Sequence, residues 1–182
     1  TEPPTPTPDV CADSVVGATH ILATGFQGTE GLTFSDDGRL FVGDVDVIAE
    51  VQPDGSWEQV ATVPSSIGQA WWNGRLMVAS SDDGTGNADG IWSVDVDTGD
   101  VELFASIEGA NFLTVSPWGT LIVTDPGLDQ VLEVDGDGAV APWIADHVSP
   151  NGTAFTADGD ALWIATTYAT VQPVWSVPVV NG

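Results

Sequence analysis

The sequence predicts an all-β fold made of one unit repeated four times, and three observations support this prediction. First, a short strand, a tight turn and a second short strand recur along the chain. Second, the residues leading into the first strands are 30, 67, 111 and 151, in steps of 37, 44 and 40 residues. Third, no window of ten or more residues keeps a helical period. Short strands repeated about every 40 residues are typical of a β-propeller, whose blades surround a central channel.

Within each unit, apolar runs alternate with Gly, Pro, Asp and Asn, which divides the unit into short strands. The predicted strands are Gly31–Ser35, Leu40–Asp44, Val47–Gln52 and Ser56–Thr62 in the first unit; Gly68–Trp72, Leu76–Ser80, Gly90–Asp95 and Val101–Ala105 in the second; Phe112–Ser116, Thr120–Asp125, Gln130–Val134 and Ala139–Ile144 in the third; and Gly152–Thr156, Ala161–Thr166 and Val174–Val177 in the fourth. We therefore expect four blades, the last with three strands before Gly182.

One further stretch, Thr19–Phe26, resembles the residues just before the third unit, so we expect it to be the outermost strand of a blade. Two ring closures are compatible with this. In the first, His20–Ala23 completes the fourth blade of a closed four-bladed ring. In the second, it belongs to a sixth blade, and this chain supplies four blades of a six-bladed ring. The strand count leaves both open, and we expect the six-bladed ring.

The chain has eight tryptophans, which we expect to pack mainly between blades. Trp92 and Trp175 occupy the same place in the third strands of blades two and four, so we expect both in the core. Trp118 lies in a predicted turn and is expected to be exposed.

A chain of 182 residues, 42% of them apolar, is long enough for one domain with a core. Residues 1–18 are rich in Pro and Thr and predict an extended linker, followed by the propeller domain at 19–182. Such linkers often join an export signal or lipid anchor to a domain, so we expect a periplasmic, secreted or lipid-anchored protein. Cys11, the single cysteine, has no partner for an internal disulfide. No apolar run approaches the roughly 20 residues that membrane insertion requires.

The charge is strongly negative: 27 acidic residues stand against Arg39 and Arg75, giving a net charge of −25. Binding to phosphates requires Lys and Arg, so the composition excludes nucleic acid as an expected partner. An anionic membrane surface would also repel the chain. The charge indicates either attraction of cations by the summed surface field or solubility in a salty or extracellular setting.

The first strand of each blade lines the channel of a propeller, so the residues leading into these strands converge at its mouth. These four lead residues are Glu30, Ile67, Asn111 and Asn151. One carboxylate and two amide oxygens suit Ca²⁺ or another divalent cation that prefers oxygen ligands. The local alternative is that Asn151-Gly152 forms an ordinary turn and that Asn111 caps its strand.

At these residues the chain resembles the senescence marker protein/gluconolactonase/regucalcin family of six-bladed propellers, with strictosidine synthase as a more distant relative. The resemblance covers about residues 20–182. It implies that Glu30, Asn111 and Asn151 correspond to the metal ligands of the family's first, third and fourth blades. It also implies a metal-assisted hydrolysis of a lactone, in which the cation polarises the carbonyl and a carboxylate accepts a proton.

The chain also departs from the family's pattern. Leu32 follows Glu-Gly where the family often has Pro, and Gly109 and Phe112 occupy the places of an Arg and an Asp around the third-blade Asn. The family's fifth-blade Asp, a ligand and candidate base, would lie after Gly182. We therefore expect an incomplete metal site and a chain that is impaired or inactive by itself.

Other polar residues receive no catalytic assignment. His147 lies four residues before Asn151 and either approaches the channel mouth or is solvated, and Asp125 is expected to form a turn. The loop at 81–90 is expected to be solvated, although it offers oxygen atoms to Ca²⁺ from Asp82, Asp83, Asn87 and Asp89.

Two functions follow from the sequence. The first is a Ca²⁺-dependent lactone or ester hydrolase, with Glu30, Asn111 and Asn151 as metal ligands and a lactone or sugar-acid-like molecule as its small partner. The alternative is a non-enzymatic exported propeller that binds a protein or a glycan on its channel face.

Overall fold

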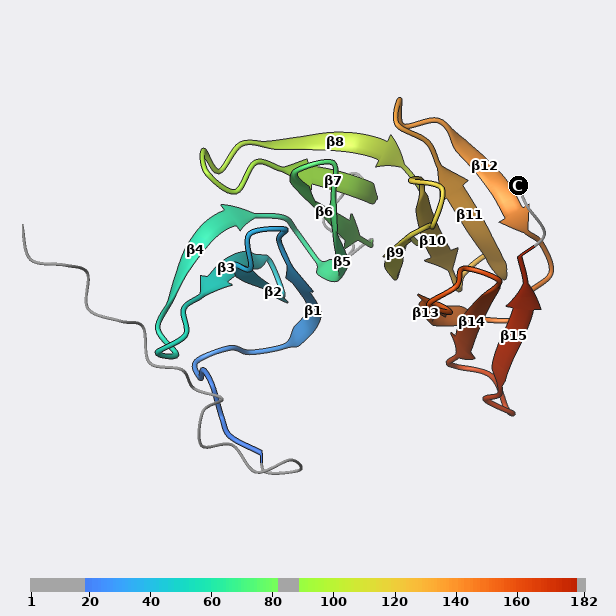
Figure 1. Cartoon of the computed structure of the whole chain (residues 1–182), viewed down its shortest axis with the longest axis horizontal. Coiled ribbons are helices and arrows are strands. Elements are labelled where there is room, and N and C mark those ends of the chain that lie inside the picture. Colours follow the sequence, from blue (N-terminus) through green and yellow to red (C-terminus); the bar gives the residue numbers. More distant parts are fainter. Residues whose placement is uncertain (1–18, 82–88, 180–182) are drawn as a thin grey trace, which may run out of the picture.

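The computed structural model describes residues 19–81 and 89–179, and within these ranges it contains strands and no helix. The strands form four antiparallel sheets, each built from consecutive strands, and the sheets are arranged as blades along an arc (Figure 1). Innermost in the arc lie β1, β5, β9 and β13, the first strands of the four blades. The predicted all-β, four-bladed propeller is confirmed.

The strand bounds follow the prediction closely. Blade one contains β1 (Thr29–Phe34), β2 (Leu40–Asp44), β3 (Val47–Val51) and β4 (Trp57–Thr62). Blade two contains β5 (Ser66–Trp72), β6 (Arg75–Ser80), β7 (Gly90–Val94) and β8 (Val101–Ser106). Blade three contains β9 (Leu113–Val115), β10 (Leu121–Asp125), β11 (Gln130–Val134) and β12 (Val140–Ile144). Blade four contains β13 (Pro150–Phe155), β14 (Ala161–Thr166) and β15 (Val174–Pro178).

The turn between the first two strands is built alike in blades one, three and four. The backbone N–H at its start donates to a carbonyl four or five residues later, at 2.8–3.0 Å. A glycine with positive φ, between 76° and 89°, completes each turn. The donor, acceptor and glycine are Ser35, Arg39 and Gly38; Ser116, Thr120 and Gly119; and Thr156, Ala161 and Gly159.

Apolar side chains fill the three seams between neighbouring blades. Phe41 and Ile48 of blade one pack with Leu76 and Val78 of blade two. Met77 and Ile91 of blade two belong to a cluster that continues through Leu113, Leu121 and Val123 of blade three. Ile122 and Val131 of blade three pack with Leu162 and Ile164 of blade four. Each blade is therefore stabilised by the next blade along the chain.

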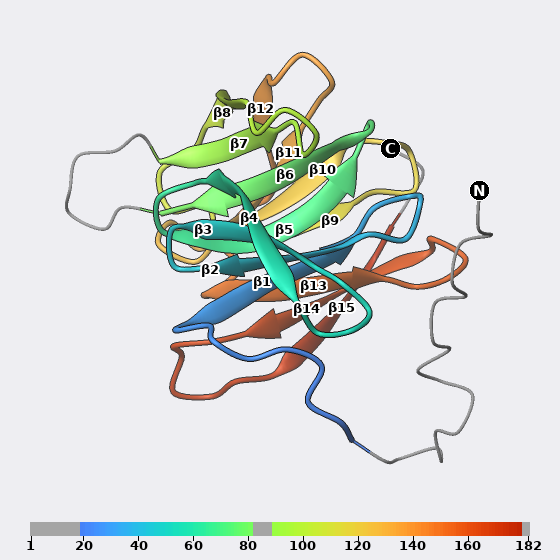
Figure 2. The ribbon, with the colours of Figure 1, turned by 90° about the vertical axis from the view of Figure 1, so that its left-hand side faces the viewer.

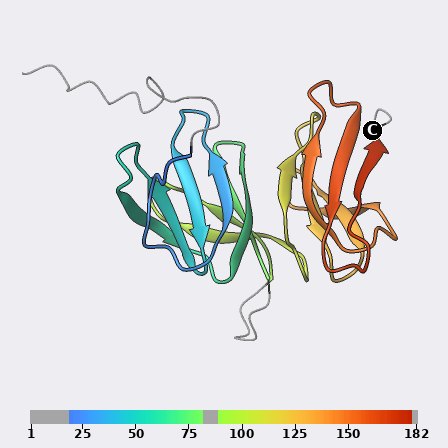
Figure 3. The ribbon, with the colours of Figure 1, turned by 90° about the horizontal axis from the view of Figure 1, so that it is seen from below.

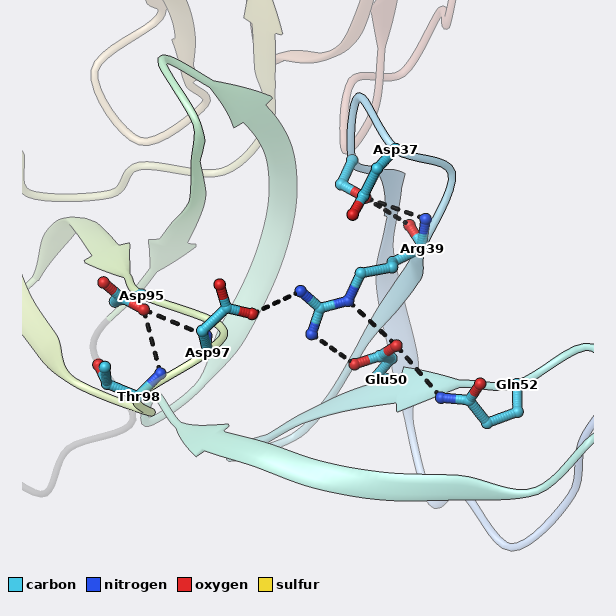
Figure 4. A network of polar contacts seen from close by, with 8 residues as sticks. Asp37, Arg39, Glu50, Gln52, Asp95, Asp97 and Thr98 are labelled. Carbon is cyan, nitrogen blue, oxygen red and sulfur yellow. Dashed lines mark hydrogen bonds and ion pairs between the residues drawn. The ribbon is translucent and has the colours of Figure 1, made fainter. Parts of the chain in front are cut away.

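A polar network also joins blades one and two (Figure 4). Arg39, at the turn before β2, donates two hydrogen bonds to the carboxylate of Glu50 in β3, at 3.1 and 2.7 Å. A third hydrogen bond, of 2.7 Å, reaches Asp97 in blade two. Arg39 holds the pKa of the Glu50 carboxyl below its ordinary value, and the pKa of Arg39 is raised in turn. The second arginine, Arg75, pairs with Asp95 and Glu102 at 3.7 and 3.4 Å.

The strand expected at His20–Ala23 is absent: the described residues before β1 form no strand (Figures 1 and 2). This segment instead follows blade one. The indole N–H of Trp57 donates to the carbonyl of Thr24 at 3.0 Å, and the ring of Phe26 stacks on Trp57 with centroids 5.0 Å apart. The placement of His20–Ala23 as the fourth strand of blade four is therefore wrong, because that sheet contains β13, β14 and β15 alone among the described residues, and its place in a sixth blade stays a prediction.

The closed four-bladed ring is also excluded. Seen from below, blade one and blade four lie on opposite sides of the opening in the arc (Figure 3). The end faces of the arc are accordingly apolar and exposed, with Leu32 and Phe34 of β1 at 62% and 58% exposure and Trp163 of β14 at 53%.

The three tryptophans singled out from the sequence have different environments. Trp92 packs against the seam between blades one and two, as expected. Trp118 is 39% exposed, also as expected. Trp175 was expected in the core but is 51% exposed, because it lies at the edge of blade four, where its ring meets His147 edge-on at 5.5 Å.

Some predictions concern residues outside the described ranges. These are the linker at 1–18 with Cys11, and Asp82, Asp83 and Asn87 of the Asp- and Gly-rich loop. Among the described residues, no helix is long and apolar enough to cross a membrane.

Candidate functional site

The lead residues lie at an irregularity shared by the first strands. In blade one, Thr29 pairs with Asp44 and Leu32 pairs with Val42, so Glu30 and Gly31 together oppose Gly43 alone. The same shift occurs at Ile67-Gly68 in β5 and at Asn151-Gly152 in β13. Two residues opposite one define a β-bulge, which bends its strand and redirects a side chain. The bulges thus mark the positions that the sequence analysis assigned to the channel mouth.

Blade three has an equivalent arrangement just before β9. Asn111 donates its backbone N–H to the carbonyl of Thr124 at 2.9 Å, and Phe112 donates its own to the hydroxyl of Thr124 at 3.1 Å. The N–H of Thr124 returns a bond to Phe112 at 3.0 Å. Asn111 and Phe112 therefore both face Thr124, as the bulge residues of the other blades face one partner.

Neighbouring bulges also contact one another through their backbones. Gly68 donates its N–H to the carbonyl of Asn111 at 2.9 Å, and a Cβ on Gly68 would lie only 2.5 Å from that oxygen. In the same way, a Cβ on Gly31 would collide with the carbonyl of Ile67. Glycine permits this close approach because it has no side chain. The lead residues of blades one, two and three are therefore held next to one another along the inner side of the arc.

Glu30 is exposed and is the one carboxylate among the lead residues. The chain before it is anchored by Asp44, a buried residue that ends β2 and accepts hydrogen bonds from the N–H groups of Gln27 and Gly28 at 2.8 and 2.5 Å. After Glu30, Gly31 is buried against blade two. The Glu30 side chain thus extends from a backbone that is fixed on both sides.

Asn111 and Asn151 are half-buried. The hydrogen bonds that the structure gives Asn111 are backbone bonds, to Thr124 and from Gly68. Asn151 follows two buried residues, and the first of these, Ser149, donates its N–H to the carboxylate of Asp129 at 2.7 Å. Both amides therefore stand on anchored backbone.

The donor set suits a hard cation chemically, because it offers one carboxylate and two amide oxygens on accessible or half-buried side chains. Within residues 19–81 and 89–179, no group of three His, Cys, Asp or Glu side chains forms a metal centre. Any cation at these bulges would therefore depend on the amides as well as on Glu30.

Asp125 has the structural role that the sequence predicted. It is buried at the end of β10, and its carboxylate accepts the N–H groups of Gly127 and Leu128 at 3.1 and 3.0 Å, together with the amide of Gln130 at 2.9 Å. These bonds form the turn into β11, which confirms the prediction.

His147 is half-buried, and its Nε2 atom lies buried without a hydrogen-bond partner among the described residues. Burial lowers the pKa of this histidine, while the nearby charge of Asp129 acts in the opposite direction. His147 is therefore packed beside Trp175 and is not a fully solvated side chain.

Sequence reasoning missed Gln69, the residue that follows the bulge of blade two. It is 5% exposed, and neither polar atom of its amide has a hydrogen-bond partner in the described part of the chain. The sequence does contain a signal for its position. A lead residue is followed by glycine in three of the four repeats, and such glycines in strands often mark bulges and close contacts between backbones, so the residue after the glycine in blade two could have been expected in a tight contact.

The model of the SMP-30/gluconolactonase/LRE-like region matches residues 28–181. The chain belongs to this family. No curated protein matches it in sequence.

Solved structures share the fold. A calcium-binding regucalcin from Agrobacterium tumefaciens is 21% identical, with a TM-score of 0.70 over 90% of this chain and 58% of its own. A gluconolactonase from Xanthomonas campestris is 21% identical, with a TM-score of 0.71 over 86% of this chain and 60% of its own. A virginiamycin B lyase from Staphylococcus aureus is 19% identical, with a TM-score of 0.61 over 83% and 55%. These neighbours resemble six-bladed propellers, and the chain spans just over half the length of each of the three.

Proposed function

We propose that this chain provides the cation-binding blades of a lactone or ester hydrolase that uses Ca²⁺ or another divalent cation. The observation that supports this most is that Glu30 and Asn151 lie in the bulges of blades one and four and that Asn111 leads into the first strand of blade three. This is the blade order that the resemblance implies for the metal ligands. Family membership and the gluconolactonase and regucalcin neighbours support the same proposal.

The residues of this chain would hold the cation through the Glu30 carboxylate and the amide oxygens of Asn111 and Asn151. A bound cation would polarise the carbonyl of a lactone or ester. The net charge of −25 supports this role, because a negative surface field concentrates cations. The proposed ligand is a lactone or sugar-acid-like molecule. We also propose that the protein is exported, with residues 1–18 as the linker that joins the propeller to an export signal or a lipid anchor.

A second candidate is an exported propeller that binds a protein or a glycan without catalysis. Two observations favour it. The carboxylate of Asp125 accepts three hydrogen bonds in its turn, so it is not available as a general base. In addition, Gly109 and Phe112 offer no charged group beside Asn111 with which to orient a substrate.

Thermal unfolding in EDTA and then in rising Ca²⁺ tests the cation site. A ligand that binds only the folded form stabilises it by about 2.7 kcal/mol at a hundredfold excess over its Kd, which raises Tm by roughly 5–10 °C in a chain of this size. We expect this rise in the parent, and its loss in Glu30→Gln and Asn151→Ala.

Glu58→Gln is the matched control, because Glu58 is an exposed acid on β4, the outer strand of the same blade. It should keep the full rise in Tm. Hydrolysis of gluconolactone, followed at constant pH, then separates the two candidates. Turnover that depends on Ca²⁺ and Glu30 supports the hydrolase, whereas cation binding without turnover supports the binding protein. A parent chain without any Ca²⁺-dependent shift rejects the cation site.

A further inference from the structure

Gln69 occupies the first position after the bulge of blade two, where its side chain faces blade one. It is almost completely buried, at 5% exposure, and its amide nitrogen and oxygen lack hydrogen-bond partners among the described residues. An unpaired buried amide destabilises a fold. Any benefit of Gln69 at this position must therefore come from the shape of its side chain and the contacts that it makes.

The contacts of Gln69 converge on the bulge that contains Glu30. A Cβ on Gly31 would lie 2.6 Å from Cγ and 2.9 Å from Cδ of Gln69. A Cβ on Gly43, the residue opposite the bulge, would collide with the amide nitrogen of Gln69. The side chain of Gln69 therefore lies against both Gly31, in the bulge, and Gly43, on the neighbouring strand opposite it.

The equivalent positions in the other blades make this arrangement specific. They contain Leu32, which is 62% exposed, Leu113, which is 2% exposed, and Thr153, which is 8% exposed. Gln69 alone among the four is long, unbranched and flat at its end. It faces the one bulge whose lead residue is an acid.

We propose that Gln69 is a positioning residue for Glu30, an inference that rests on the proposed cation site. Gln69 fills the space beside Gly31 and Gly43, and the carbonyl of Ile67 closes the remaining side, so the bulge keeps one conformation. The carboxylate of Glu30 is then oriented before the cation arrives, and little ordering is required when it binds. The length and the unbranched shape of Gln69 provide this effect.

The test compares Ca²⁺ affinity, measured by titration calorimetry on the folded chain, with Tm measured in EDTA. Gln69→Ala leaves Gly31 and Gly43 uncovered and should weaken Ca²⁺ binding at least tenfold. Gln69→Met has the same length and no branch, so it should keep Kd within about threefold while its Tm in EDTA stays equal or rises.

Val94→Ala is the matched control, because Val94 is fully buried in the same seam but lies on β7, two strands away from β5. It should lower Tm in EDTA and leave Kd unchanged, as a purely structural residue would. If Gln69→Ala lowers Tm but keeps the parent Kd, the positioning role is overturned and the cation site stands. If the parent itself binds no Ca²⁺, the proposed function fails, and this inference fails with it.

Discussion

Leu32 and Leu113 occupy the same position, one residue after the bulge in the first strand of a blade, yet 62% of Leu32 is exposed and only 2% of Leu113. The difference in exposure depends on whether another blade packs against the face that carries the leucine. Leu113 packs in the cluster between blades two and three, whereas Leu32 lies on β1, in the blade at the end of the arc (Figure 1). The strand pattern in the sequence therefore predicts which face of a blade is apolar, but the blade beside it determines whether that face is buried.

Gly68 and Gly152 show that the neighbouring blade also determines how tightly the backbone is packed. Both are the second residue of a bulge. A Cβ on Gly68 would lie 2.5 Å from the carbonyl of Asn111 and 2.7 Å from Cα of Phe112, whereas a Cβ on Gly152 would meet no atom within 4 Å. Identical sequence signals thus serve a tight contact in one blade and an open edge in another.

The largest effect should come from shortening the two leucines. Leu113→Ala leaves a cavity in the seam between blades two and three and should lower the free energy of unfolding by about 2–5 kcal/mol. Leu32→Ala removes a mostly exposed side chain and should cost less than about 1 kcal/mol. Urea unfolding of both variants measures the two values.

Equal losses in the two variants would contradict the comparison, because they would place Leu32 in an interface as tight as that of Leu113. An unchanged urea dependence of the unfolding free energy in both variants is the control, since it shows that the same surface is exposed on unfolding.

The sequence predicted the strands well because alternation and Asp-Gly turns are local signals. The bounds of β2, β11 and β14 were predicted without error, and the main deviations lie at the starts of first strands. There β1, β5 and β13 begin two residues earlier than expected. The bulge interrupts the alternation of side chains at these points, so the pattern is visible only after it.

The lead residues were also accessible from the sequence, because the repeat aligns them. Other features were not, since they depend on contacts between blades. The burial of Gln69 requires Gly31 and Gly43 from a different sheet. The path of residues 19–28 depends on Trp57, 33 residues after Thr24. The ion pair between Arg39 and Asp97 crosses from one repeat to the next. A period in the sequence does not reveal such partners.

An intermediate effect is expected from adding one methyl group to each bulge glycine. Gly68→Ala forces backbone of blades two and three apart and should destabilise the fold by about 1–3 kcal/mol. Gly152→Ala has free space and should be neutral or stabilising by up to about 1 kcal/mol, since alanine restricts the unfolded chain. Thermal unfolding of the two variants in EDTA measures this. A larger loss in Gly152→Ala than in Gly68→Ala would show that the open edge is covered in solution.

The smallest effect should come from the ion pairs across the first seam. Arg39→Met leaves the mostly buried Glu50 without its arginine partner and should lower the free energy of unfolding at pH 7 by about 1–2 kcal/mol. Arg75→Met is the control, because its pairs are longer and more exposed, and it should cost less than about 0.5 kcal/mol.

The pH dependence of Arg39→Met gives the sharper test. In the parent, Arg39 lowers the pKa of Glu50, so this pair stabilises the fold above the ordinary glutamate pKa of about 4.3, and the contribution is lost as pH falls through the lower folded value. In Arg39→Met, the carboxylate of Glu50 keeps the hydrogen bond from Gln52 at 3.1 Å but loses the neighbouring cation, so burial should raise its pKa above that in the parent, and protonation relieves the cost as pH falls. Urea unfolding from pH 7 to pH 3 should therefore show a difference between parent and variant that shrinks with acid. A difference that stays constant over this range would mean that Arg39 stabilises the fold by packing on Phe41 of its own blade, whose ring centroid lies 5.2 Å from its guanidinium carbon, and not by its charge.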